Sequence, residues 1–287
     1  MSSAITVSGL RKTYGSFVAV DDVDLQVEAG EVFAFLGPNG AGKTTTIDIL
    51  TGAQRRTGGA VSVLGRDPQD DEREWRVQVG VVPQGTADYQ ELTVYEVIDH
   101  FATFYPDPFP TRQLIDMVGL GAKATTYSTK LSGGQRRRLD VAVGVVGRPR
   151  LLFLDEPTTG LDPEARREAW ELVRLLTGEG MTTVLTTHYL DEAQELAQRI
   201  GVIAGGRMLH VGTLDQLAQL TGSQQRVSYD LDPLVEVSPG LATRLESQPH
   251  SCLYATDEPT ALLRLLLDAA QRQGIAEIPG LQVTQPS

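Results

Sequence analysis

GPNGAGKTT, residues 37–45, is the stretch of sequence that decides the fold. It follows the apolar run EVFAFL at 31–36 and precedes a helical stretch from Lys43 to Leu50. Glycines at these positions let successive backbone N–H groups turn inward and form a concave nest for anionic oxygens. A helix that begins at such a nest aims the positive end of its dipole at the same oxygens. The stretch therefore predicts a phosphate-binding loop between a buried strand and a helix.

The predicted loop consists of nine residues: Gly37, Pro38, Asn39, Gly40, Ala41, Gly42, Lys43, Thr44 and Thr45. Lys43 is predicted to neutralise the β- and γ-phosphates of a nucleotide, and the Thr44 hydroxyl to bind Mg²⁺. The alternative is a glycine-rich surface turn. That alternative does not explain why a strand pattern precedes the loop and a helix pattern follows it.

A second buried strand, LLFLDE at 151–156, ends abruptly in two carboxylates. Asp155 at the end of this strand is well placed to hold Mg²⁺, directly or through water. Glu156, one residue further, can polarise the water that attacks a γ-phosphorus. The alternative for the two acidic residues is an N-cap of the helix that starts after Pro157. The presence of a phosphate-binding loop in the same chain favours the catalytic interpretation.

Strand and helix patterns alternate over most of the chain, which predicts an α/β fold with a largely parallel sheet covered on both faces. Residues 4–36 contain short β-rich runs, and a further β pair is predicted at 60–64 and 77–82. We expect a P-loop NTPase core over 1–220, with an antiparallel β subdomain and a helical insertion at about 86–130. Two further β runs flank the Gly205-Gly206 turn.

Beyond about residue 220 the pattern of predicted strands and helices changes, which predicts a small C-terminal α+β domain at 221–287. We expect β runs at 226–232, 251–257 and 280–284, a helical stretch ending at Gln248, and a helix at 259–273. The pattern predicts an accessory domain.

Composition restricts the partners of this chain. Acidic residues outnumber basic ones 37 to 25, giving a formal charge of −12, which disfavours nucleic acid as the main partner. The only compact basic run, Arg136-Arg137-Arg138, is interpreted as a solvated helix face. Cys252 is the only cysteine, which suits a reducing cytoplasm. No run of about 20 apolar residues is present, so a membrane role is expected to require a partner.

A third motif identifies a family. LSGGQ at 131–135 is a second glycine-rich turn that opens a helix, and it carries a hydroxyl but no lysine. With the loop at 37–45, the acidic strand at 151–156 and further matches in the same order, residues 4 to about 220 resemble the nucleotide-binding subunit of an ABC transporter. The stretch from 105 to 173 is similar to the drug- and antibiotic-resistance exporters of the ABC-2 class.

The resemblance implies roles for further residues, each at the position that matches the family's motif. Tyr14 matches the aromatic that stacks on adenine, and Gln84 matches the residue that contacts the Mg²⁺ and water cluster. Asp162 matches the loop that crosses between two active sites, and His188 the switch histidine that contacts the γ-phosphate. The signature turn that binds the γ-phosphate held by a second subunit matches Ser132, Gly133, Gly134 and Gln135.

The resemblance further implies that two ATP molecules lie between two such domains, each meeting Lys43 of one subunit and Ser132 of the other. The second subunit is either another copy of this chain or a different ABC ATPase. The resemblance also implies a separate membrane permease, with this chain peripheral on the cytoplasmic side of the membrane. We expect an ATPase that powers export of a drug, antibiotic or lipid-like solute. An importer subunit and a soluble, non-transport ABC ATPase remain as alternatives.

Overall fold

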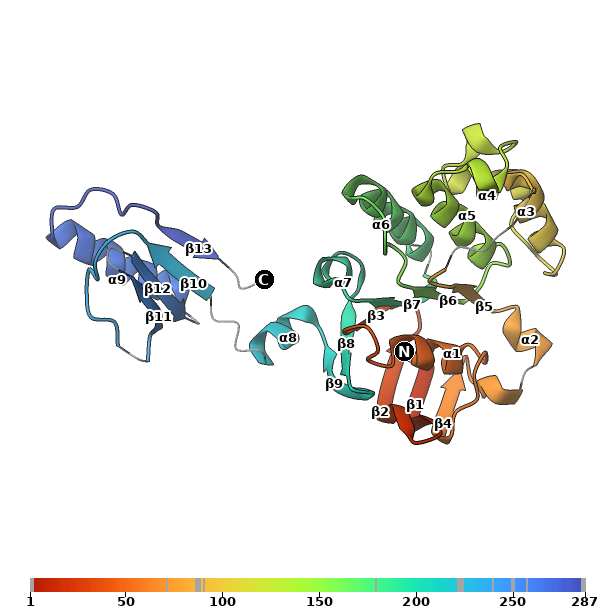
Figure 1. Cartoon of the computed structure of the whole chain (residues 1–287), viewed down its shortest axis with the longest axis horizontal. Helices are drawn as coiled ribbons and strands as arrows, with labels where there is room; N and C mark the ends of the chain where they lie inside the picture. Colours follow the sequence, from red (N-terminus) through yellow and green to blue (C-terminus); the bar gives the residue numbers. More distant parts are fainter. Residues whose placement is uncertain are drawn as a thin grey trace. The chain divides into compact units, whose positions relative to one another are not determined.

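The computed structural model describes residues 3–70, 72–85, 89, 91–178, 180–220, 225–238, 240–248, 251–256 and 258–284. The chain divides into two compact units (Figure 1), unit 1 up to Leu214 and unit 2 from Asp215. This boundary lies six residues before the domain boundary predicted from the sequence pattern, between residues 220 and 221.

The central element of unit 1 is a six-stranded sheet in the order β5-β6-β7-β3-β8-β9. All neighbours in it run parallel except the last pair, β8 and β9, which are antiparallel across the Gly205-Gly206 turn. The α/β prediction is therefore confirmed. The bounds are β3 Val32–Leu36, β5 Val79–Val82, β6 Leu151–Asp155, β7 Thr182–Thr187, β8 Arg199–Ala204 and β9 Arg207–Gly212.

A smaller antiparallel sheet, in the order β2-β1-β4, forms the predicted β subdomain. Its strands are β1 Ser3–Tyr14, β2 Phe17–Glu28 and β4 Gly58–Val63. The predicted pairing of the β runs at 60–64 and 77–82 is wrong. The first run forms β4 beside β1, whereas the second forms β5 beside β6. The two runs differ in burial: β4 is partly exposed at an outer edge, and β5 joins the parallel sheet.

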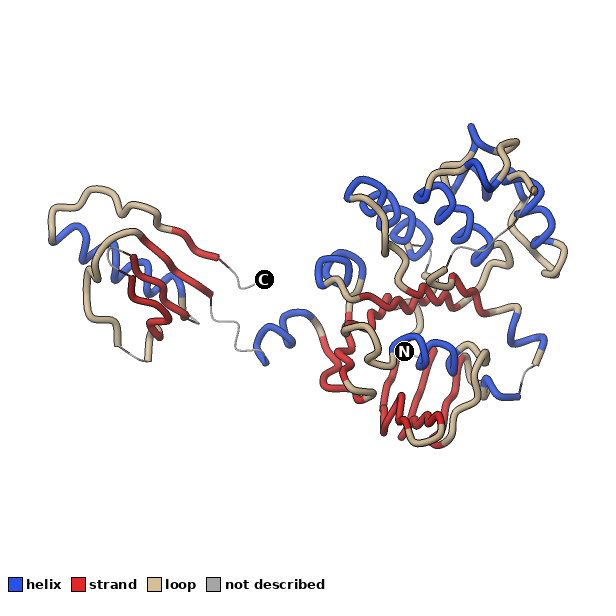
Figure 2. The backbone as a smooth tube through the Cα atoms, in the orientation of Figure 1, coloured by secondary structure: helices blue, strands red, loops and turns tan. Residues whose placement is uncertain are grey.

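The helices of unit 1 lie on both sides of the six-stranded sheet (Figures 1 and 2). Helix α1 and the small sheet cover one side, and α3 to α7 cover the other. The bounds are α1 Lys43–Leu50, α2 Arg73–Arg76, α3 Val94–Ala102, α4 Thr111–Met117, α5 Gly133–Val145, α6 Pro163–Thr177 and α7 Leu190–Leu196, with 3-10 turns at Pro68–Asp70, Gly121–Lys123 and Ser128–Lys130.

Successive side chains of β6 enter two different hydrophobic cores, as the two-residue period of a strand requires. Leu152 and Leu154 pack with the helices that carry Val97, Leu114 and Leu139. Leu151 and Phe153 pack with the small sheet and α1. Since all five residues of β6 are buried, its end is held firmly in position.

Residues 86–88 and 90, where the helical insertion is expected to begin, lie outside the described residues. Helix α3 is N-capped by Thr93, whose hydroxyl accepts a hydrogen bond from the Glu96 backbone while the Glu96 carboxylate accepts one from the Thr93 backbone. None of the helices in the described part of the chain is both long and apolar enough to cross a bilayer.

Unit 2 contains an antiparallel sheet in the order β11-β12-β10-β13, with its own hydrophobic core against α9. The predicted helical stretch ending at Gln248 is wrong: Thr243–Gln248 is the strand β11, paired with β12. Pairing with a buried neighbour outweighs the helical preference of Leu, Glu and Gln. The bounds are α8 Leu214–Leu220, β10 Gln225–Tyr229, β12 Ser251–Thr256, α9 Pro259–Arg272 and β13 Gln282–Thr284.

Candidate functional site

The glycine-rich loop 37–45 connects the end of β3 to the start of α1. Its backbone leaves no room for side chains at two positions. A Cβ on Gly37 would lie 2.2 Å from the Ile203 carbonyl oxygen, and Gly42 has φ +102°. Pro38, Asn39 and Gly40 are exposed, Ala41 is buried and Thr45 is half-buried. The loop therefore presents its backbone to solvent at its tip and holds its ends tightly against the sheet.

Lys43 is buried beneath this loop, with only 4% of the residue exposed. Its ammonium donates hydrogen bonds to the carbonyl oxygens of Gly37, at 2.7 Å, and Pro38, at 3.1 Å. Its nitrogen also lies 3.5 Å from Glu156 Oε1. A buried cation surrounded by oxygen acceptors is already desolvated, so it interacts strongly with an anion that enters the loop.

Thr44 and Asp155 meet across the end of the sheet. The Thr44 hydroxyl lies 3.2 and 3.4 Å from the two carboxylate oxygens of Asp155. The Thr186 hydroxyl, on the neighbouring strand β7, also donates to Asp155. An oxygen pair of this kind fits Mg²⁺, which usually takes one or two protein ligands and completes its shell with water and phosphate. The described residues include no group of three or more His, Cys, Asp and Glu side chains that can hold a metal.

Glu156 lies at the centre of a ring of polar groups. Its Oε2 accepts hydrogen bonds from Gln84 Nε2 and from the Thr159 hydroxyl, both at 3.0 Å. His188 Nδ1 lies 3.5 Å from the same oxygen, a charged pair only when the imidazole is protonated. Four residues that the sequence places far apart, Lys43, Gln84, Glu156 and His188, are thus brought together.

The backbone of Glu156 is also unusual. Its φ is +45°, a left-handed conformation that side-chain-bearing residues rarely adopt. The Glu156 backbone N–H donates to the Thr186 hydroxyl at 2.9 Å, and the residue is only 6% exposed. Such strain is concentrated at functional sites, where the surrounding structure holds it in place.

Arg137 is a site residue that the sequence interpretation missed. The run Arg136-Arg137-Arg138 was expected to form a solvated face, but Arg137 is only 5% exposed. Its guanidinium donates to the carbonyl oxygens of Pro83, at 2.6 Å, Asp155, at 3.0 Å, and Pro157, at 2.9 Å.

These three carbonyls directly flank Gln84 and Glu156 in the sequence. The guanidinium therefore fixes α5 to both segments that carry the central polar groups. Spacing was the available signal, because residues 137, 141 and 145 share the buried face of the helix. Thr159 and Thr186 were missed as well. Threonines at the end of a buried strand such as TTVLTT signal hydroxyl groups that need partners.

The signature turn at 131–135 forms a second, separate constellation. Ser132 caps α5: its hydroxyl accepts from the Gln135 backbone at 3.3 Å, and the Gln135 side chain accepts from the Ser132 backbone at 3.1 Å. Gly133 and Gly134 line a hollow together with Asp162, which caps α6. Within the part of the chain that the structure describes, the polar contacts of Lys43, Thr44 and Glu156 involve none of residues 131–135.

Tyr14 lies at the end of β1 and is 45% exposed. The Lys12 ammonium is 4.8 Å from the centre of its ring. The exposed ring is accessible for stacking, and the Lys12 ammonium already lies over it.

Two pKa shifts follow from burial near the acidic strand end. Burial raises the pKa of the Asp48 carboxyl on α1, and the nearby charge of Asp155 raises it further. Burial lowers the pKa of Arg137, against the opposing effect of Asp140, Asp155 and Glu192.

Comparisons with known proteins bear on this geometry. A family model described as ABC transporter matches residues 20–159. The chain is 38% identical over 281 residues to the daunorubicin/doxorubicin resistance ATP-binding protein DrrA of Streptomyces peucetius, covering 93% of this chain and 85% of that protein. The chain belongs to the ABC transporter family of ATP-binding subunits. It therefore binds and hydrolyses ATP, as members of this ABC family do.

Other comparisons agree with the ABC assignment. The chain is 35% identical over 276 residues to the Nod factor export ATP-binding protein I of Cupriavidus metallidurans, with 93% of this chain and 90% of that protein covered. A solved ATP-binding subunit of an ABC transporter is 28% identical, with a TM-score of 0.69, and covers 76% of this chain and 93% of its own. The predicted resemblance to the ABC family is confirmed.

Proposed function

We propose that this chain is the ATPase subunit of an exporter, and that the residues around Glu156 bind Mg²⁺-ATP and hydrolyse it. The observation that supports the catalytic assignment is the ring of Lys43, Gln84 and His188 around the Glu156 carboxylate. A general base needs a fixed geometry within hydrogen-bonding reach of the proton it removes. Glu156 has that fixed geometry and lies one residue beyond Asp155.

The contacts of Lys43 indicate how nucleotide binding prepares the base. When phosphate oxygens enter the loop, the Lys43 ammonium exchanges its contact with Glu156 Oε1 for contacts with phosphate. Oε1 is then free to accept the proton of a water molecule, while Gln84 and Thr159 hold Oε2. The water oxygen attacks the γ-phosphorus, the bond to the β–γ bridging oxygen breaks, and ADP and phosphate leave.

Mg²⁺, when bound at Thr44 and Asp155, neutralises charge on the phosphate oxygens. The remaining loop residues bind the phosphates through the backbone, and Tyr14 stacks on the base. His188 is the proposed contact to the γ-phosphate, because it approaches Glu156 from the end of β7.

The separation of the signature turn from the loop supports a dimer. We propose that Ser132, Gly133, Gly134 and Gln135 of one subunit complete the site formed by Lys43 of another, with Asp162 at the boundary. The hydroxyl of Ser132 and the open end of α5 are exposed and therefore available to an anion from a partner.

Export through a separate membrane permease is proposed from the relatives, whose names refer to drug resistance and Nod factor export. The chain is then peripheral on the cytoplasmic face of the membrane. The formal charge of −12 disfavours nucleic acid as the main partner. The ABC core over 1–220 and an accessory role for 221–287 are part of this proposal.

The decisive test replaces Glu156 by Gln and measures steady-state ATP hydrolysis and nucleotide affinity. We expect turnover to fall by about 10²-fold or more, the usual contribution of a general base, with ATP affinity retained. Size-exclusion chromatography with ATP should show an increased dimer fraction. Glu171→Gln, on an exposed position of α6, is the matched control and should hydrolyse ATP normally. Undiminished turnover in Glu156→Gln would remove Glu156 from this role.

Export is tested separately, by reconstituting the chain with its permease in vesicles and following ATP-dependent movement of a labelled drug. Accumulation on the side opposite the ATPase supports export. Movement toward the ATPase side supports the importer alternative. ATP hydrolysis that depends on no membrane protein supports a non-transport ATPase.

A further inference from the structure

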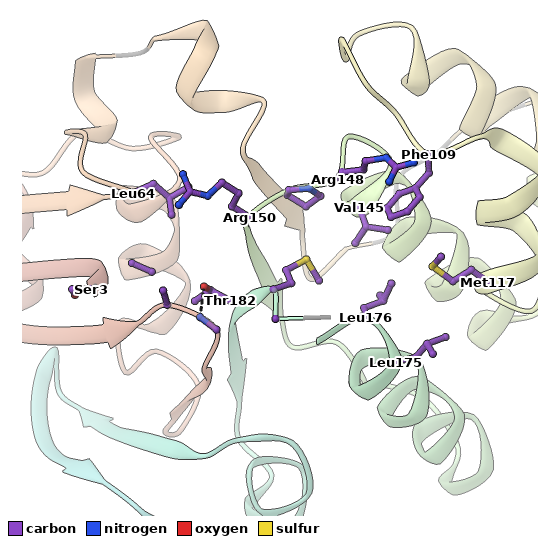
Figure 3. Close-up of a pocket in the computed structure, with 16 residues that line it drawn as sticks. Ser3, Leu64, Phe109, Met117, Val145, Arg148, Arg150, Leu175, Leu176 and Thr182 are labelled. Carbon is purple, nitrogen blue, oxygen red and sulfur yellow. Dashed lines mark hydrogen bonds between the residues drawn. The ribbon is translucent and has the colours of Figure 1, made fainter. Parts of the chain in front are cut away.

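A cavity of about 570 Å³ lies in unit 1 at the edge of the sheet opposite the nucleotide site (Figure 3). Leu151 and Thr182 begin the parallel strands β6 and β7, and Thr182 lines this cavity. Asp155 lies at the other end of β6, about 13 Å away for four residues at about 3.3 Å each. The cavity is therefore distinct from the site around Glu156, and its size is that of a small-molecule pocket.

The walls of the cavity come from three parts of unit 1. Figure 3 shows Ser3 of β1 and Leu64, the residue after β4, on one side and Phe109 and Met117 from the helical region on the other. Leu176 of α6 lies between them. Most of the lining side chains are apolar, but polar atoms share the lined surface, so the cavity suits a ligand that has both an apolar and a polar part.

The charges in this cavity are the reverse of those of the whole chain. Acidic residues outnumber basic ones 37 to 25 overall. Among the described residues that line the cavity, Arg148 and Arg150 carry charge and none is acidic. Both arginines are exposed, and both stand at the wall next to Pro149. A cationic rim on an apolar pocket complements an anionic head on an apolar body.

Arg148 is held in place for such a role. Its backbone has φ +53°, and its guanidinium lies 4.2 Å from the centre of the Phe109 ring. Asp107 lies 3.9 Å from it but is 89% exposed, which makes that ion pair weak. Arg150 uses one nitrogen to donate to Gln78. Guanidinium has five donors, so both arginines retain donors for a ligand.

We propose that this cavity is a binding site for an amphipathic organic anion, a compound with an apolar body and a carboxylate or phosphate head. The apolar body packs against Phe109, Leu176 and Met181, and the head is bound by Arg148 and Arg150. Because the site is remote from Glu156, the proposal stands or falls independently of the ATPase mechanism.

The test measures binding of decanoate and of decyl phosphate to the full chain by titration calorimetry, below the concentration at which either probe forms micelles. We expect saturable binding of at least one of them. Decyltrimethylammonium, with the same chain and the opposite charge, and acetate, with the head alone, should each bind at least tenfold more weakly. The head group with the higher affinity indicates whether a carboxylate or a phosphate compound is the ligand.

Two sets of variants locate the binding. Arg148→Asn with Arg150→Gln should weaken anion binding at least tenfold, and Asn tolerates the left-handed backbone at 148. Ala29→Trp, at an exposed lining position, should fill the mouth of the cavity and weaken binding similarly. Arg73→Gln, on the exposed surface of α2, is the matched control and should bind like the original chain.

Three results would overturn the proposal. The first is that neither anionic probe shows saturable binding. The second is that the arginine variants bind the probes as well as the original chain does. The third is that saturating ATP displaces the probes, which would place them in the glycine-rich loop. Thermal unfolding of each variant confirms that lost binding does not reflect lost folding.

Discussion

Replacing Arg137 by Lys tests whether the guanidinium positions the catalytic segments. Lysine keeps the positive charge but has a single nitrogen, and the three carbonyl acceptors belong to separate positions at Pro83, Asp155 and Pro157. We expect the lysine to retain one of the three hydrogen bonds. At about 1.5 kcal/mol for each lost bond to a charged group, the variant loses about 3 kcal/mol of unfolding free energy.

Tryptophan fluorescence makes this loss measurable for unit 1 alone. The chain has two tryptophans, Trp75 and Trp170, and both lie in unit 1. For a unit of this size, about 3 kcal/mol corresponds to a decrease in Tm of about 6–12 °C. Because the bonded carbonyls flank Gln84 and Glu156, we also expect ATP turnover to fall at least tenfold.

Arg138→Lys, a substitution at the neighbouring arginine of the sequence, is the matched control. Arg138 pairs with Glu168 at the surface, with side chains 22% and 47% exposed, so its replacement should change unfolding free energy by about 0.5 kcal/mol or less. If the Arg137→Lys and Arg138→Lys variants have the same Tm and hydrolyse ATP equally fast, the positioning role of Arg137 is refuted.

Four further substitutions test other parts of the site. Lys43→Ala should weaken ATP affinity about 10- to 100-fold, since one charge-assisted contact is lost; an unchanged Kd in a nucleotide titration would contradict this. Thr186→Val leaves the Glu156 N–H unpaired and should cost about 1–3 kcal/mol in urea unfolding, where an unchanged midpoint would argue against the hydrogen bond. Gly37→Ala should yield little folded protein, because its Cβ would overlap a backbone oxygen, and normal expression with a native Tm would show that the loop can shift. Asp48→Asn should stabilise the Mg²⁺-free chain relative to the original chain, and by more as pH rises from the ordinary carboxyl pKa to the raised pKa of Asp48. The original chain loses stability over that window, because its folded state must give up a proton that it holds more tightly than the unfolded state does. A difference in unfolding free energy that does not change with pH would refute this.

The sequence predicted the parts of the site that rest on spacing within a motif. The loop around Lys43 and the strand end at Asp155 and Glu156 are local patterns, each with a strand before it. The approach of Gln84 and His188 to Glu156 is not local, and the family resemblance implied only that Gln84 contacts the Mg²⁺ and water cluster and that His188 contacts the γ-phosphate. The structure supplies the physical reason, since the strand ends that carry these residues meet at one edge of a parallel sheet.

What the sequence did not predict depends on partners distant in the chain. Arg137 resembles its two neighbours in composition, and only the contact of α5 with the strand ends buries it. The strand at 243–248 has helix-favouring residues and becomes a strand because β12 offers a pairing edge. The runs at 60–64 and 77–82 both have strand character, but propensity cannot assign them to different sheets.

The left-handed backbone of Glu156 affects which substitutions this position can accept during evolution. A strained φ at a residue other than glycine costs about 1–3 kcal/mol. Replacement by glycine would relieve that cost, but it would also remove the carboxylate that pairs with the buried Lys43 ammonium. Backbone strain and the Lys43 contact therefore act on folding stability in opposite directions at this one residue. Their balance decides how readily a duplicated copy, once released from selection for turnover, loses the carboxylate.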